Sequence, residues 1–133
     1  FFDDYAHHPT EINAVLDSVN NSFSKKNIYC FFQPHRVSRV KFLRYKFSRC
    51  FKKAGLVLLC PIYKAGENIK LNFDYRKFAS EIALNSKTRV IMIENELDLH
   101  KFVKHNIFGS NIVIGMGAGS ISNWIRNLKL KLK

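Results

Sequence analysis

Short apolar runs alternate along this chain with longer segments whose apolar residues recur at helical spacing. The apolar runs are expected to form strands at 27–32, 56–62, 88–93 and 111–116. The other segments are expected to form helices over 9–23 and 38–54 and from residues 74, 95 and 121. Strands that are apolar throughout are buried on both faces, as in parallel sheets covered by helices. The sequence therefore predicts a three-layer, Rossmann-like α/β domain, with a mostly parallel sheet and helices on both faces.

Several helix boundaries are marked by residues that suit a helix end. Pro9 fits a first helical turn, where its missing N–H would be unpaired anyway. Ser38, Asp74 and Asn95 are expected to cap the next three helices, because their side chains can accept from a free backbone N–H. Gly55 is expected to end the helix that begins at Ser38.

The length of 133 residues fits one domain over residues 1–133, and no repeat or linker divides it. No apolar run reaches the roughly 20 residues that a membrane-spanning helix needs. Acidic residues at the N-terminus argue against a signal peptide. The cysteines are odd in number and widely spaced, which favours buried free thiols: Cys30, Cys50 and Cys60. A reduced, cytoplasmic setting is expected.

The formal net charge of +12 raises the possibility of a polyanionic partner. The basic residues are spread along the chain, however, and Lys, Asn, Ile and Phe are abundant together, which indicates compositional bias. No recognised nucleic-acid-binding motif is present, so neither nucleic acid nor a membrane is the expected partner. A standalone basic α/β module that binds a polyanion such as RNA stays as an alternative.

Four unusual loops are expected at one rim of the sheet, where ligands of open α/β folds bind. They span residues 3–8, 33–39, 63–67 and 117–120. In the second loop, Arg36 and Arg39 lie three residues apart at an expected helix start and could hold a carboxylate or phosphate together. A solvated basic helix turn is the alternative for this loop.

The first loop contains residue types that could bind a metal ion: Asp3, Asp4, His7 and His8. Adjacent histidines point in different directions and no spaced third ligand is evident, so no metal site is expected. Helix capping or ligand binding could explain the same residues. The glycines at 115, 117 and 119 have G-x-G-x-G spacing, which indicates a tight turn and not a dinucleotide site. The chain also has no P-loop motif and no arrangement typical of a catalytic nucleophile, so no catalytic residue is expected in it.

Four motifs resemble the C-terminal domain of the Mur ligases, in the same order and at similar spacing. They are Asp-Asp-Tyr-Ala-His-His-Pro-Thr-Glu, Gln-Pro-His-Arg-Val-Ser-Arg, Ile-Tyr-Lys-Ala-Gly-Glu and Gly-Ala-Gly-Ser-Ile, between residues 3 and 121. The second motif favours the members that add L-alanine to UDP-N-acetylmuramate in peptidoglycan synthesis. The ligase that recycles murein peptides usually lacks it and is the alternative within the superfamily. Val37 and Pro61 depart from the residues common in the family, at positions with no expected ligand contact.

The resemblance implies a three-domain enzyme whose UDP-sugar-binding and central ATPase domains lie outside this chain. ATP and Mg²⁺ would bind mainly to the central domain, and an acyl phosphate would react with L-alanine to release ADP and phosphate. By motif position, Asp4 resembles the aspartate that holds the ATP ribose. The residues that resemble the L-alanine site are Tyr5, His7, His35, Arg36 and Arg39. The partners implied are UDP-N-acetylmuramate, L-alanine, ATP and the remaining domains of the polypeptide, and the chain alone is expected to be inactive.

Overall fold

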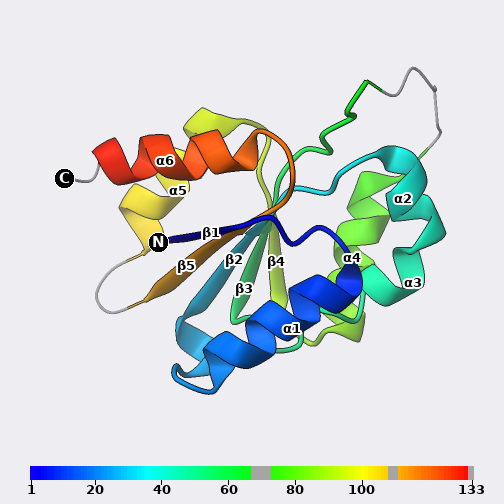
Figure 1. Ribbon diagram of the computed structural model, residues 1–133, viewed down its shortest axis with the longest axis horizontal. Coiled ribbons are helices and arrows are strands. Elements are labelled where there is room, and N and C mark those ends of the chain that lie inside the picture. Colours follow the sequence, from blue (N-terminus) through cyan, green and yellow to red (C-terminus); the bar gives the residue numbers. More distant parts are fainter. Residues whose placement is uncertain (67–72, 108–110, 132–133) are drawn as a thin grey trace.

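The structure is a computed structural model that describes residues 1–66, 73–107 and 111–131. Its strands are β1 (Phe2–Asp4), β2 (Ile28–Phe32), β3 (Leu56–Leu59), β4 (Arg89–Met92) and β5 (Ile112–Met116). Its helices are α1 (Pro9–Asn20), α2 (Val37–Phe42), α3 (Arg44–Phe47), α4 (Tyr75–Asn85), α5 (Glu96–Asn106) and α6 (Ile121–Lys131), with a 3-10 turn, η1 (Lys25–Asn27). The strands form one sheet in the order β1-β5-β2-β3-β4, and every pair is parallel (Figure 1).

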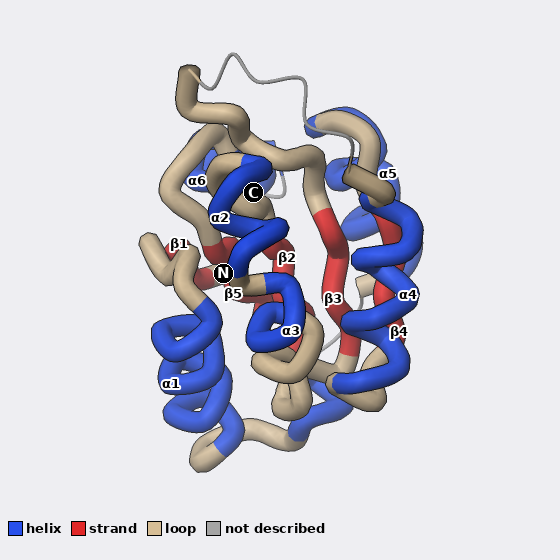
Figure 2. Tube along the Cα trace, turned by 90° about the vertical axis from the view of Figure 1, so that its right-hand side faces the viewer, coloured by secondary structure: helices blue, strands red, loops and turns tan. Residues whose placement is uncertain are grey.

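Helices cover both faces of this sheet, as predicted (Figures 1 and 2). On one face α1, α2, α3 and α4 pack on a core that includes Ile12, Phe47 and Phe78. On the other face α5 and α6 pack on a second core that includes Leu99 and Ile125. The residues of β2 and β3 alternate between the two cores, which explains why these strands are apolar throughout. The three-layer α/β prediction is confirmed.

Three of the predicted helix starts are also confirmed. Pro9 is the first residue of α1. The side chain of Asp74 accepts from the backbone N–H of Lys77 at the start of α4, and Asn95 accepts from Asp98 at the start of α5. Each bond satisfies a backbone donor that has no partner within its helix.

The predicted helix over 38–54 is wrong. Leu43 has a non-helical backbone (φ −104°, ψ 15°) and separates α2 from α3, and turns follow after Phe47. Ser86 supplies the physical reason, because its hydroxyl donates to the Ser48 carbonyl (2.6 Å) and accepts from the Phe51 N–H (3.2 Å). These long-range bonds replace helical ones. Gly55 therefore does not end a helix. Instead, the chain passes close to Lys25 at this position, and a Cβ on residue 55 would lie 2.5 Å from the Lys25 carbonyl oxygen.

Other elements also differ from the prediction: α1 ends at Asn20 and β3 at Leu59, each three residues before its expected end. The residue that precedes α2 is Arg36, and Ser38 lies inside the first helical turn, so the predicted cap is wrong. Strand β1 was missed because it has only three residues, of which Phe2 and Asp3 are exposed. It therefore contains no continuous apolar run. Its pairing with β5 is a long-range contact that local sequence patterns do not encode.

Candidate functional site

Three neighbouring strands bring the first, second and fourth loops together at the carboxyl edge of the sheet. In β1, Asp4 is in register with Met116 of β5, and the Gly117 N–H donates to the Asp4 carbonyl (3.3 Å). On the other side of β5, the Gln33 N–H donates to the Met116 carbonyl (2.9 Å). The rim expected from the sequence is therefore formed by β1, β5 and β2 lying side by side (Figure 1).

Asp4 ends β1 and is half-buried at this rim. One of its carboxylate oxygens, Oδ1, accepts from the Ala6 N–H (2.9 Å), which fixes the side chain. None of the residues described donates a hydrogen bond to the other oxygen. A carboxylate held in this way can accept from a sugar hydroxyl, so the residue fits the nucleotide role that the resemblance implied.

The two adjacent histidines of the first loop have different surroundings. The ring of His8 accepts from the Thr10 N–H (3.3 Å), and the His8 N–H donates to the Glu11 carboxylate (3.1 Å), which forms a capping box at the start of α1. The Nδ1 of His7 lies 2.8 Å from the Tyr5 carbonyl oxygen and 3.9 Å from the Glu11 carboxylate. Its ring faces His35, at a centroid distance of 5.8 Å. His8 is therefore a helix-capping residue, and His7 belongs to the rim.

His35 lies at the centre of the rim. Arg39, one turn into α2, donates from Nη1 to His35 Nδ1 (3.1 Å). A guanidinium has no lone pair to offer, so His35 Nδ1 must be the acceptor, and a neutral imidazole with its proton on Nε2 fits this bond. The ring of Tyr63 stacks on the same imidazole at 5.6 Å, with 26° between the ring planes.

Tyr5 and Arg36 are placed differently from the other predicted site residues. Tyr5 is 73% exposed, and in the described part of the chain its ring contacts none of the other predicted residues. Arg36 is exposed and has a positive φ (67°, with ψ 127°), a strained backbone for a residue with a side chain. Its backbone N–H donates to the Tyr63 carbonyl (2.8 Å), which holds it there. The structure thus brings His7, His35 and Arg39 into one group and leaves Tyr5 and Arg36 at its exposed border.

Gln33 was missed as a site residue, although it belongs to the second motif. It is 3% exposed, and its Nε2 donates to the Ser120 hydroxyl while its Oε1 accepts from the Ile121 N–H, both at 2.9 Å. Gln33 therefore joins the end of β2 to the start of α6. An uncharged amide directly after a buried strand is the sequence signal that could have identified it.

Tyr63 was also missed, although it lies in the third of the predicted loops. Its N–H donates to the Pro34 carbonyl (2.8 Å), so it adds a bridge beside His35 just beyond β2 and β3. Gly119 makes room for its ring, because a Cβ there would lie 2.4 Å from Tyr63 Cγ. Glu67 of the same loop lies outside the described residues.

The rim carries positive charge that none of the described residues neutralises. Among the residues that the structure describes, no carboxylate lies within 4.0 Å of the guanidinium of Arg36 or Arg39. By contrast Arg44, on α3, forms a two-bond ion pair with Glu81, and this hydrogen bonding raises the pKa of Arg44. Two guanidiniums at a helix start, without an acidic partner, can bind a small carboxylate.

Neither a metal cluster nor a membrane span is found. Within residues 1–66, 73–107 and 111–131, no three His, Cys, Asp or Glu side chains are grouped to hold a metal ion. No helix in those ranges is long and apolar enough to cross a bilayer. Asp3, one of the residues considered for a metal, accepts a hydrogen bond from the Ser122 hydroxyl instead. The three cysteines are buried free thiols, and burial raises their pKa values.

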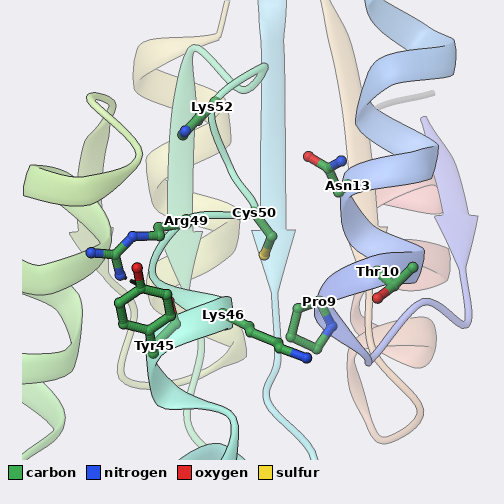
Figure 3. Close-up of a pocket in the computed structure, with 8 residues that line it drawn as sticks. All are labelled: Pro9, Thr10, Asn13, Tyr45, Lys46, Arg49, Cys50 and Lys52. Atoms are coloured by element: carbon green, nitrogen blue, oxygen red, sulfur yellow. Dashed lines mark hydrogen bonds between the residues drawn. The ribbon is translucent and has the colours of Figure 1, made fainter.

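An open cavity of roughly 530 Å³ lies between the start of α1 and α3 (Figure 3). Its lining residues are Pro9, Thr10, Asn13, Tyr45, Lys46, Arg49, Cys50 and Lys52. None of them is a predicted site residue. Lys46 reaches across the cavity toward Pro9, whereas the guanidinium of Arg49 lies over the Tyr45 ring at 3.6 Å. The cavity is therefore a separate feature from the rim.

Comparisons with known proteins show the family to which the chain belongs. Residues 1–119 match the family model described as "Mur ligase, glutamate ligase domain". UDP-N-acetylmuramate–L-alanine ligase of Pelagibacter ubique (strain HTCC1062) is 56% identical over 128 residues, which are 96% of this chain and 28% of that protein. The chain thus spans little more than a quarter of the length of that curated relative.

Solved structures share the fold. UDP-N-acetylmuramate-alanine ligase MurC of Thermotoga maritima superimposes with a TM-score of 0.67 at 24% identity, over 96% of this chain and 25% of that chain. A domain from a putative UDP-N-acetylmuramate:L-alanyl-γ-D-glutamyl-meso-diaminopimelate ligase of Haemophilus ducreyi 35000HP superimposes with a TM-score of 0.68 at 18% identity, over 98% of this chain and 89% of that chain. Fold, motifs and family model agree, and the chain belongs to the Mur ligase family.

Proposed function

We propose that this chain is the C-terminal domain of an ATP-dependent ligase that joins L-alanine to UDP-N-acetylmuramate in peptidoglycan synthesis. In this reaction ATP phosphorylates the carboxylate of the sugar nucleotide, and the L-alanine amine displaces phosphate to form the amide. ADP and phosphate leave. The relative that is 56% identical carries the name of this reaction and supports the proposal.

The observation that carries the proposal is the arrangement of His35 and Arg39. The guanidinium is held by the imidazole at 3.1 Å, and none of the described carboxylates pairs with it. A free amino acid presents one small carboxylate that such a guanidinium can bind. Arg36 adds a second guanidinium at the exposed border, and His7 and Tyr5 complete the side of the site nearest α1.

Asp4 is proposed to contact the nucleotide; it ends β1, which β5 separates from β2 and the second motif. Its carboxylate would accept from a ribose hydroxyl, with Mg²⁺ and the phosphates held mainly by the central domain. No residue of this chain is assigned a catalytic role. The domain orients the amino acid and excludes water from the reactive acyl phosphate when it closes on the rest of the enzyme. The chain on its own is accordingly expected to show no turnover.

The test is phosphate release by the full-length protein with ATP, Mg²⁺ and UDP-N-acetylmuramate, with amino acids added singly. Release is expected to depend on L-alanine. Arg39→Ala is expected to raise the KM for L-alanine by roughly 10- to 100-fold, as for a lost hydrogen bond to a charged group, with little change in the stability of the domain. Lys41→Ala is the matched control, because Lys41 is an exposed basic residue of the same helix.

Other outcomes would assign a different function to the chain. Release that requires an L-alanyl peptide and ignores L-alanine would indicate the recycling ligase of the same superfamily. Binding of RNA that weakens steeply with salt, by a protein without any ligase turnover, would support the polyanion-binding alternative. Neither alternative is favoured by a specific contact at the rim.

A further inference from the structure

Tyr63 is tied by its backbone to both sides of His35. The Tyr63 N–H donates to the Pro34 carbonyl, and the Arg36 N–H donates to the Tyr63 carbonyl, each at 2.8 Å. Together these bonds make a short parallel bridge between His35 and Tyr63. The loop after β3 therefore fixes the backbone of the second motif on both sides of His35.

The Tyr63 side chain acts on the His35 side chain as well. The two rings stack with their centroids 5.6 Å apart. The backbone at Gly119 also approaches the Tyr63 side chain, so closely that a Cβ there would lie 2.4 Å from Cγ. The ring thus contacts both the backbone of the turn at Gly119 and the imidazole, so it can restrict how the imidazole rotates.

The orientation of His35 in turn decides where the Arg39 guanidinium points. Arg39 Nη1 donates to His35 Nδ1 at 3.1 Å, and this bond requires Nδ1 to face α2. An imidazole rotated by half a turn about its Cβ–Cγ bond would present a carbon in place of Nδ1 and lose the bond. Among the described residues no hydrogen bond or ring contact joins the Tyr63 side chain to Arg39, so the interactions that connect this side chain with the guanidinium run through His35.

We propose that Tyr63 is a positioning residue of the L-alanine site. Its ring holds His35 in the orientation that accepts from Arg39, and thereby aims the Arg39 guanidinium at the amino-acid carboxylate. This role rests on the function proposed above. It belongs to the face of the ring and not to the phenol hydroxyl, because stacking is the side-chain interaction that connects Tyr63 with His35.

The first test uses full-length variants and steady-state kinetics. Tyr63→Leu is expected to raise the KM for L-alanine by about 3- to 10-fold, the range set by the loss of one aromatic pair, with kcat and the KM for ATP unchanged. Tyr63→Phe keeps the ring and is expected to match the wild type. Phe23→Leu is the control, because Phe23 has similar exposure (45% against 40% for Tyr63) and lies before β2, at the opposite edge of the sheet.

A double-mutant cycle then asks whether Tyr63 acts through His35. In a His35→Ala background, Tyr63→Leu is expected to cause no further rise in the KM for L-alanine. A full additional rise would overturn the proposal, since it would mean that Tyr63 contacts the amino acid or Arg39 independently. Equal rises for Tyr63→Phe and Tyr63→Leu would also overturn it, because they would assign the effect to the hydroxyl.

A readout that does not depend on activity separates this proposal from the proposed reaction. In the full-length protein labelled with ¹⁵N at histidine, His35 is expected to show an unprotonated Nδ1 and a protonated Nε2, and Tyr63→Leu is expected to move both signals toward each other. If L-alanine-dependent phosphate release is absent but the signals move, the function fails and the positioning of His35 stands. Unchanged His35 signals in Tyr63→Leu overturn the positioning role whatever the activity.

Discussion

The strained backbone at Arg36 can be tested by removing its side chain in two ways. Glycine has no steric penalty at φ 67°, ψ 127°, whereas alanine keeps the Cβ that causes the strain. Strain at such a position lowers the unfolding free energy by about 1–3 kcal/mol. A glycine lowers it by about 0.5–1 kcal/mol, because it increases the conformational entropy of the unfolded chain. Arg36→Gly is therefore expected to exceed Arg36→Ala in unfolding free energy by about 1 kcal/mol, or roughly 4 °C in Tm.

The structure indicates that other contributions to this difference are small. The Arg36 side chain is exposed, so both variants lose about the same surface contacts. Either substitution keeps the backbone hydrogen bonds of residue 36. Its N–H donates to the Tyr63 carbonyl (2.8 Å), and its carbonyl accepts from the Val40 N–H (3.2 Å). Urea unfolding of the 133-residue chain measures the difference. In the full-length enzyme both variants lose the same guanidinium, and both are expected to raise the KM for L-alanine by about tenfold.

Lys87 provides the matched control. It also has a positive φ (50°), directly after the Ser86 cap of α4, and it is exposed. Lys87→Gly is expected to be more stable than Lys87→Ala by a similar amount, without any effect on the KM for L-alanine. If Arg36→Gly is no more stable than Arg36→Ala while the Lys87 pair differs as expected, the idea that the rim stores backbone strain is refuted.

Two further predictions concern the core of the domain. Gln33→Leu is expected to lower the unfolding free energy by about 2–3 kcal/mol, because it leaves the buried Ile121 N–H without its acceptor; urea unfolding checks this, and an unchanged unfolding free energy would contradict it. The unfolding free energy is expected to fall as pH rises above about 9, because the buried thiols have raised pKa values and stay protonated while the thiols of the unfolded chain ionise. For three thiols, the limiting slope of this fall is about 4 kcal/mol per pH unit. A cysteine-free variant should lose this contribution to the pH dependence.

The layer architecture could be predicted from the sequence because it follows from local patterns. Apolar runs and helical stripes identified four of the five strands, and Pro9, Asp74 and Asn95 marked true helix starts. Where the prediction was wrong, long-range bonds decided the structure. The hydroxyl of Ser86 replaces helical bonds near Ser48, and no local pattern encodes this contact.

The candidate site was predictable in part for the same reason. Motif resemblance selected His7, His35 and Arg39, and the structure places these three side chains together. Tyr63 and Gln33 were missed because their roles consist of contacts with residues distant in the sequence, a stacked ring in one case and a helix start in the other. The assignment of the group to L-alanine remains a proposal for the kinetic tests.

The pairing of β1 with β5 has a consequence for biosynthesis. Phe2 and Asp4 pair with Ile114 and Met116, near the opposite end of the domain. During synthesis on the ribosome, β1 with Asp4 cannot pair until almost the whole domain has emerged, because its partner strand β5 is translated late. A nascent chain stopped before residue 112 can assemble β2, β3 and β4, yet it cannot place Asp4 beside the second motif. The rim is thus among the last parts of the domain to form during translation, and a prematurely terminated product would lack it.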